Sequence, residues 1–243
     1  MSDNLWFGVG GSMKTIGLIG GMSWESTATY YQVINETVRQ QLGGLHSAKI
    51  LMESVDFAEI AVHQFAGEWD VCAQMVEDAA QRLTRAGADF LVISTNTMHK
   101  IVPKLMTHLT VPLLHIADAT AMALREAGIG HVALLGTKTT MIEPFYKERL
   151  RAQGFRVSVP DQAAMDIVDR IIFEELCRGV FEDESRKCCR AIIAALTEHG
   201  ADAVVLGCTE IGLLVKQSDC SVPLFDTTLI HARQAARLAM EID

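Results

Sequence analysis

The chain has 243 residues, 49% of them hydrophobic, and its 30 acidic and 21 basic side chains give a formal net charge of −9. This length suffices for one large domain or two of ordinary size, and the composition excludes general disorder. The acidic balance argues against a nucleic-acid partner, because such binding needs clustered Lys and Arg, and no apolar run approaches the roughly 18 residues of a membrane span.

Residues 1–12 are expected to form a leader, because a clear strand pattern begins only after Met13. From there, short apolar strands alternate with amphipathic helices. The first strand is expected at 15–19, and the helix after it should begin behind Ser23 as N-cap and end at Gly43. Continuous apolar strands that alternate with helices predict a parallel sheet covered on both faces.

The sequence also repeats itself once. Three segments recur in the same order, at 16–21 and 132–137, at 83–89 and 196–202, and at 111–113 and 222–224. The repeat predicts an α/β fold with two pseudo-symmetric three-layer α/β/α halves, mainly parallel sheets and a ligand cleft between the halves. We expect the first half at 13–110 and the second at 111–210, with the segment 211–243 returning to the first.

Two polar loops follow equivalent strands of this repeat. Thr95 comes after the strand expected at 90–93, and Cys208 comes after the strand expected at 203–206. In open α/β sheets, ligands bind beyond the carboxyl ends of the strands. The two side chains are therefore predicted to face opposite sides of one ligand, with backbone N–H and hydroxyl groups nearby that suit a carboxylate.

The six cysteines include no CxxC pair, and their spacing does not suggest a disulfide framework. Without a secretory signal, they predict a reduced, cytoplasmic protein. Cys208 is expected to be the reactive one, because a nearby helix N-terminus and N–H donors should lower the pKa of its thiol. The histidines lack metal-ligand spacing, so no metal site is expected, and His99 and His115 should make local hydrogen bonds.

Several motifs together resemble one known family. The first glycine turn, the Thr95-Asn96-Thr97 run, residues 54–57 and the late Gly-Cys-Thr-Glu run at 207–210 are similar to the aspartate/glutamate racemase superfamily, and most similar to its bacterial L-aspartate/L-glutamate-specific branch. The resemblance implies a cofactor-independent, commonly homodimeric enzyme that binds an amino acid between two halves. A typical member carries one cysteine in each half, and the two exchange the α-proton on opposite faces of the substrate.

Carried over to this chain, the resemblance implies that Cys208 is the main base and that Thr95 replaces the usual first cysteine. It implies substrate-binding roles for residues in the loops around them: Met22, Gln64, Asn96, Thr97, Thr137 and Thr209. Because a threonine hydroxyl is a far weaker acid than a thiol, we expect the D-to-L direction to suffer.

The sequence does not determine which side chain the substrate carries. The segment 51–59 lacks an arginine that some relatives use for the distal carboxylate, and Cys177 stands where relatives often have a lysine. The substrates are therefore expected to be L-aspartate and L-glutamate or a broader set of amino acids. The alternatives are a single-cysteine decarboxylase or cis–trans isomerase of the same fold, or an amino-acid-binding protein without catalysis.

Overall fold

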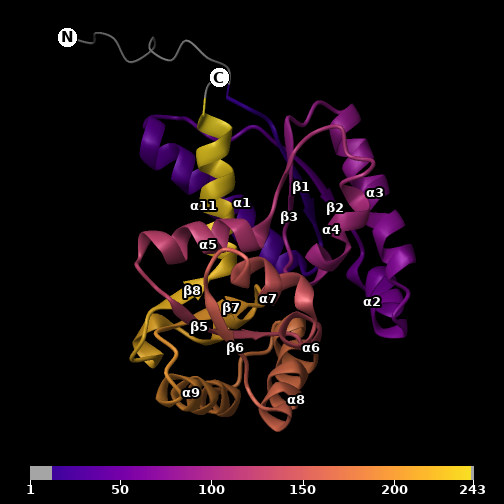
Figure 1. Cartoon of the computed structure of the whole chain (residues 1–243). Coiled ribbons are helices and arrows are strands. Elements are labelled where there is room, and N and C mark those ends of the chain that lie inside the picture. Colours follow the sequence, from indigo (N-terminus) through magenta and orange to yellow (C-terminus); the bar gives the residue numbers. More distant parts are fainter. Residues whose placement is uncertain (1–12, 242–243) are drawn as a thin grey trace, which may run out of the picture.

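The computed structural model describes residues 13–241, so the expected leader at 1–12 lies outside the described residues. Two parallel sheets of four strands have the same strand order, β2-β1-β3-β4 and β6-β5-β7-β8. The strands are β1 (Ile16–Gly20), β2 (Ile50–Ser54), β3 (Phe90–Ile93), β4 (Leu113–Leu114), β5 (His131–Gly136), β6 (Arg156–Ser158), β7 (Ala203–Gly207) and β8 (Leu224–Asp226). The shared order confirms the two α/β halves that the sequence repeat predicts (Figure 1).

Helices connect the strands throughout both halves. The helices are α1 (Trp24–Leu42), α2 (Phe57–Ala66), α3 (Trp69–Arg85), α4 (Val102–Leu105), α5 (Ile116–Glu126), α6 (Lys138–Ile142), α7 (Pro144–Arg151), α8 (Gln162–Arg170), α9 (Asp183–Glu198), α10 (Ile211–Leu214) and α11 (Thr227–Met240). Four short helical segments accompany them: η1 (Thr97–Ile101), η2 (Ile171–Glu175), η3 (Leu176–Arg178) and η4 (Gln217–Asp219). None of the described helices has both the length and the apolar character needed to cross a membrane.

Each half has three layers, because the buried side chains of its strands point alternately to the two faces of its sheet. In the first half, Ile16 and Leu18 pack beneath α1 and α11, whereas Ile19 packs against α3 on the other face. In the second half, Leu134 packs with α5 and α7, whereas Leu135 packs with α8 and α9. This is the predicted α/β/α arrangement.

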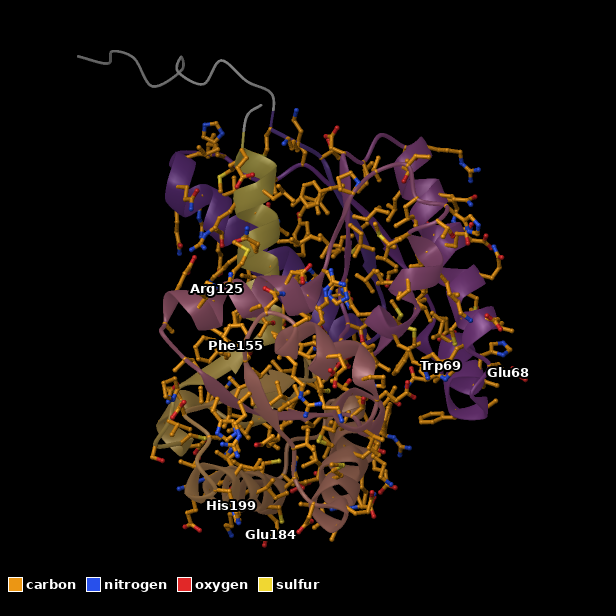
Figure 2. All side chains as sticks on the ribbon, in the orientation of Figure 1. Glu68, Trp69, Arg125, Phe155, Glu184 and His199 are labelled. Atoms are coloured by element: carbon orange, nitrogen blue, oxygen red, sulfur yellow. The ribbon has the colours of Figure 1, made fainter. Side chains whose placement is uncertain are left out.

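Side chains fill the space between sheets and helices in both halves (Figure 2). Phe155 is buried in the cluster that joins α5 to the second sheet, and the figure shows it below α5. Glu184 and His199, at the two ends of α9, lie at the outer end of the second half. The polar ends of α9 therefore face away from the region where the halves meet.

The halves exchange their last helices. Helix α5 follows β4 of the first sheet, yet its Ile116 and Leu124 belong to the core of the second half. Helix α11 follows β8 of the second sheet, yet its Ala232 and Ala236 belong to the core of the first half. Figure 1 shows α11 (yellow) beside α1, near the beginning of the described chain. This exchange ties the two halves to each other.

The observed strand pairing differs from the boundaries expected at 110 and 210. Leu113 pairs with Leu91, so β4 belongs to the first sheet, and Leu224 pairs with Val204, so β8 belongs to the second. Of the segment 211–243, helix α11 packs in the first half, whereas α10 and β8 stay with the second. Edge strands of two or three residues are too short for their sequence pattern to show which sheet they join. Pairing with strands distant in the sequence decides their sheet.

Candidate active site

A cavity of about 380 Å³, its open mouth included, lies where the carboxyl ends of β3 and β7 meet. The eight site residues predicted from the sequence all line it: Met22, Gln64, Thr95, Asn96, Thr97, Thr137, Cys208 and Thr209. They come from both halves of the molecule, as expected for a ligand site between pseudo-symmetric units. The structure thus brings the predicted residues together, while their chemical roles stay predictions.

Cys208 lies at the end of β7 and is buried, with 6% of its surface exposed. Its Sγ donates a hydrogen bond to Glu210 Oε2 at 2.9 Å, and the Thr209 hydroxyl donates to the same oxygen at 2.9 Å. Glu210 Oε1 accepts a hydrogen bond from the Ser23 hydroxyl at 2.7 Å. Ser23 is the N-cap of α1 in the first half. Glu210 therefore connects the Cys208 thiol of the second half to the first half.

The electrostatic environment of Cys208 is the reverse of the one expected from the sequence. Burial raises the pKa of the thiol well above its usual range, and the negative charge of Glu210 raises it further. The expectation of a lowered pKa is therefore wrong. The physical reason is that burial disfavours the thiolate most, and the negative charge of the Glu210 carboxylate that contacts the sulfur disfavours it further, so that both outweigh the backbone hydrogen bond.

Thr95 follows β3 in the first half, in the loop equivalent to that of Cys208. It is 9% exposed, and its hydroxyl makes no hydrogen bond within the described part of the chain. Its carbonyl oxygen accepts a hydrogen bond of 2.7 Å from His99 Nδ1. The backbone of Thr95 is thus fixed while its hydroxyl is available to a ligand in the cavity.

Asn96 carries an unsatisfied acceptor at the cavity. Its Nδ2 donates to the Thr227 hydroxyl at 3.0 Å, which connects the loop to the start of α11. Its Oδ1 is buried and has no hydrogen-bond partner among residues 13–241. Because buried acceptors in proteins are nearly always paired, this oxygen is suited to a donor on a bound ligand, such as an ammonium group.

Hydroxyl groups from both halves meet across the same cavity. The Thr97 and Thr137 hydroxyls are 3.1 Å apart, and the latter lies 3.1 Å from the Thr140 hydroxyl. Thr137 also accepts from the backbone N–H of Thr140, as the N-cap of α6. Such hydroxyls can turn their protons toward an anionic group, which makes this part of the cavity able to bind a carboxylate.

The first glycine turn approaches the neighbouring backbone too closely for a side chain. Gly21 has φ of +95°, and a Cβ at this position would lie 2.1 Å from the carbonyl oxygen of Val55. Its backbone N–H donates to the Thr27 hydroxyl at 2.8 Å. Glycine therefore allows the turn to place the following residue, Met22, in the wall of the cavity.

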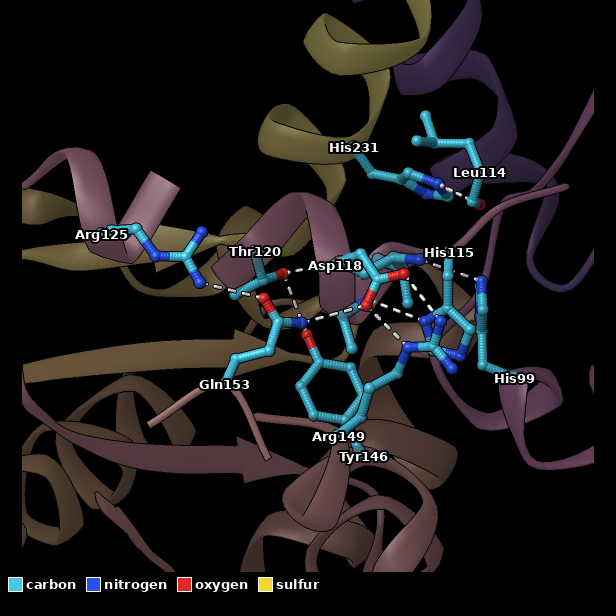
Figure 3. A network of polar contacts seen from close by, with 12 residues as sticks. His99, Leu114, His115, Asp118, Thr120, Arg125, Tyr146, Arg149, Gln153 and His231 are labelled. Atoms are coloured by element: carbon cyan, nitrogen blue, oxygen red, sulfur yellow. Dashed lines mark hydrogen bonds and ion pairs between the residues drawn. The ribbon is translucent and has the colours of Figure 1, made fainter. Parts of the chain in front are cut away.

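Three neutral histidines, His99, His115 and His231, lie close to one another, and His99 holds the loop of Thr95 (Figure 3). His99 donates from Nδ1 to Thr95 O and accepts at Nε2 from the N–H of Ile116, 3.2 Å away. Burial lowers the pKa of His115 to about 3 and that of His231 to about 4. The local hydrogen bonds expected for His99 and His115 are confirmed, and His115 Nδ1 accepts from a backbone N–H at the start of α5.

Several lining residues were not predicted as site residues: Phe57, Met98, Ile172, Phe173, Cys177 and Glu210. Glu210 was within reach of sequence reasoning, since a carboxylate two residues after a candidate base is a plausible proton acceptor. Phe173 comes from η2, where no motif marks it, whereas Cys177 comes from η3 and stands where the resemblance puts a lysine in many relatives. Their position in the cavity wall depends on how this segment packs.

The chain is similar to known proteins over most of its length. A family model described as Asp/Glu/Hydantoin racemase matches residues 19–235. The chain is 20% identical to the broad specificity amino-acid racemase RacX of Bacillus subtilis (strain 168), over 90% of this chain and 95% of that protein. A solved structure from Yersinia pestis, assigned to the Asp/Glu racemases, is 50% identical with a TM-score of 0.87, over 94% of this chain and 100% of that one. An aspartate racemase homologue from Pyrococcus horikoshii OT3 is 36% identical with a TM-score of 0.81, over the same shares.

Proposed function

The chain belongs to the Asp/Glu/Hydantoin racemase family, and from this membership we propose that it is a cofactor-independent racemase of L-aspartate, L-glutamate or a broader set of amino acids. One observation carries the proposal. Thr95 and Cys208 come from equivalent strand ends of the two halves and line the same cavity. A base on one side of Cα and a proton donor on the other are what inversion at that carbon requires.

In the proposed reaction, Cys208 is the base for the L-amino acid. Its S–H proton passes to Glu210 Oε2, which lies 2.9 Å away, and the resulting thiolate takes the α-proton. The raised pKa of the thiol makes the thiolate a strong base once it forms. The Thr95 hydroxyl then delivers a proton to the opposite face of Cα and takes one from water, and the hydroxide so formed removes the proton from Glu210, so the site returns to its starting state.

The substrate's two charged groups have suitable partners in the cavity. We assign the α-ammonium to Asn96, whose buried Oδ1 lacks a hydrogen-bond donor among the described residues. We assign the α-carboxylate to the hydroxyls of Thr97 and Thr137, with Met22 and Gln64 as neighbouring contacts. Fixed donors at the carboxylate would stabilise the charge that develops there when the α-proton leaves.

Catalysis without pyridoxal phosphate is supported by the residues of the cavity. That cofactor is held as a Schiff base by a lysine, and no described residue that lines the cavity is a lysine. A homodimer in the cytoplasm belongs to the same proposal. The homodimer is supported by the resemblance to the family, and the cytoplasmic location by the six cysteines, all of which are free.

Exchange of the α-hydrogen for deuterium tests the proposed function. In D2O, we expect the enzyme to replace the α-hydrogen of L-amino acids and to form the D isomer more slowly, as followed by proton NMR and chiral chromatography. Binding of an amino acid without exchange or D product would establish a binding protein instead. Release of CO2 from a malonate derivative would establish a decarboxylase.

A second prediction concerns the proton acceptor Glu210. Because the proton passes within the Cys208–Glu210 pair, exchange by the unmodified enzyme should depend little on pH between 6.5 and 8. We expect Glu210→Gln to lower the exchange rate about a hundredfold at pH 7. Its remaining activity should then rise about tenfold per pH unit, since burial still keeps the pKa of Cys208 high and only the thiolate fraction reacts.

The matched control for this experiment is Glu184→Gln, which removes an exposed carboxylate of α9 that pairs with Lys187. It should leave both the rate and its pH dependence unchanged. Identical pH profiles for Glu210→Gln and the unmodified enzyme would show that Glu210 does not accept the thiol proton.

A further inference from the structure

We infer that the cavity binds amino acids with uncharged side chains in preference to aspartate and glutamate, and that Cys177 helps to set this preference. The preference concerns the site of the proposed racemase and rests on that proposed function. The sequence leaves two possibilities for the substrates: the acidic amino acids alone, or a broader set of amino acids. The inferred preference selects the neutral members of the broader set.

The charges around the cavity are the first reason. Glu210 is the only Asp, Glu, Lys, Arg or His among the described residues that line it. Residues 1–12 and 242–243 add no basic side chain, since their sequence contains no Lys, Arg or His. A side-chain carboxylate of the substrate would therefore lie in the same cavity as Glu210 without a cation to balance it. Burial of such an unpaired charge is strongly unfavourable.

The lysines that are close in sequence to the cavity have other partners. Lys100 Nζ lies 2.7 Å from Glu143 Oε1 and 3.8 Å from the centre of a Trp69 ring. Lys138 Nζ lies 2.5 Å from Asp166 Oδ1. Both cations are thus held by side chains outside the lining of the cavity, so neither is available to a carboxylate within it.

Part of the cavity lining is apolar, and both halves contribute to it. Phe57 comes from the first turn of α2, whereas Ile172, Phe173 and Cys177 come from η2 and η3. The rings of Phe65 and Phe173 pack edge to face with centroids 5.1 Å apart, which holds α2 against η2. A substrate side chain that contacts this wall gains by burying apolar surface, whereas a carboxylate would lose its hydration there.

Cys177 keeps this part of the cavity free of positive charge. Burial and the charges of Glu210 and Glu25 raise the pKa of its thiol, so the side chain is neutral. Glu25 Oε2 is itself buried and has no hydrogen-bond partner within the described residues. The negative charges of two carboxylates therefore reach Cys177 and disfavour a further anionic group beside it. A cation at position 177 would instead favour an anionic group of the substrate there.

The experiment compares amino acids of equal shape and different charge. Rates of α-hydrogen exchange in D2O are measured for L-glutamate against L-glutamine and for L-aspartate against L-asparagine, with L-methionine as an apolar reference. We expect kcat/KM for each amide to exceed that of its acid at least tenfold, and L-methionine to exchange faster than L-glutamate.

A charge at position 177 should change this ratio. In Cys177→Lys, we expect the ratio of glutamine to glutamate to fall at least tenfold, because the ammonium group can pair with the distal carboxylate. Cys177→Met has nearly the same length without the charge and should keep the preference for glutamine. Cys220→Lys, at the end of η4 and outside the cavity lining, should keep the ratio of the unmodified enzyme.

The outcomes separate this preference from the proposed function. Exchange of acidic amino acids as fast as their amides, in the unmodified enzyme, would overturn the preference and leave the racemase function standing. Absence of exchange with every amino acid would overturn both. If Cys177→Lys does not fold, the comparison of the acids with their amides in the unmodified enzyme still decides the matter.

Discussion

Replacement of Cys208 by serine is expected to lower α-hydrogen exchange of L-amino acids at least a thousandfold. The hydroxyl is a much weaker acid than the thiol, so the base needed for proton abstraction is almost never formed near neutral pH. The substitution changes one buried atom and keeps a donor for Glu210 Oε2, so the fold should be retained. Exchange in D2O and binding of the same amino acid, measured by calorimetry, separate lost chemistry from lost binding.

The control for this result is Cys188→Ser, which alters a partly buried thiol of α9 away from the cavity lining. It should retain nearly the full exchange rate. If Cys208→Ser still exchanges the α-hydrogen at a rate near that of the unmodified enzyme, Cys208 is not the base, and the proposed reaction is wrong.

Replacement of Thr95 by cysteine is expected to raise exchange of D-amino acids about a hundredfold. Burial raises the pKa of a thiol at this position above its ordinary value of about 8.5, but the thiol is still a far stronger acid than the threonine hydroxyl and supplies a base that the hydroxyl cannot form. Because the Thr95 hydroxyl has no hydrogen-bond partner among the described residues, the substitution breaks no polar contact. The measurement compares exchange rates of the D and L isomers of one amino acid.

Thr84→Cys is the matched control, since it places the same new thiol near the end of α3, outside the cavity lining. It should not increase exchange of the D isomer. Unchanged D-side exchange in Thr95→Cys, with normal exchange of the L isomer, would show that position 95 does not face Cα of the substrate.

Much of the candidate site could be predicted because it depends on strand ends. Thr95 and Cys208 follow apolar segments that form the inner strands β3 and β7, and polar residues beyond such strands meet at one edge whatever the details of packing. The repeat also predicted the equivalence of the two loops, and the matching strand orders confirm it. The edge strands β4 and β8 were assigned to the wrong halves, since they are too short to carry a pattern.

The charge state of the site could not be predicted in the same way. The sequence places Glu210 two residues from Cys208, but it does not say which way the carboxylate points. In the structure it points at the sulfur and at Ser23 of the other half. Together with burial, that contact raises the pKa of the thiol where the sequence suggested a lower one.

By itself, the sequence determined the alternation of strands and helices, the pairing of two similar halves and the strand ends at which a ligand site would form. These features follow from local patterns of apolar residues and from the short-range geometry of parallel sheets. The tertiary structure alone decided the helix exchange, the contact between Cys208 and Glu210 and the presence of Phe173 in the cavity wall. Those depend on side-chain direction, burial and contacts between distant segments, which no local pattern encodes.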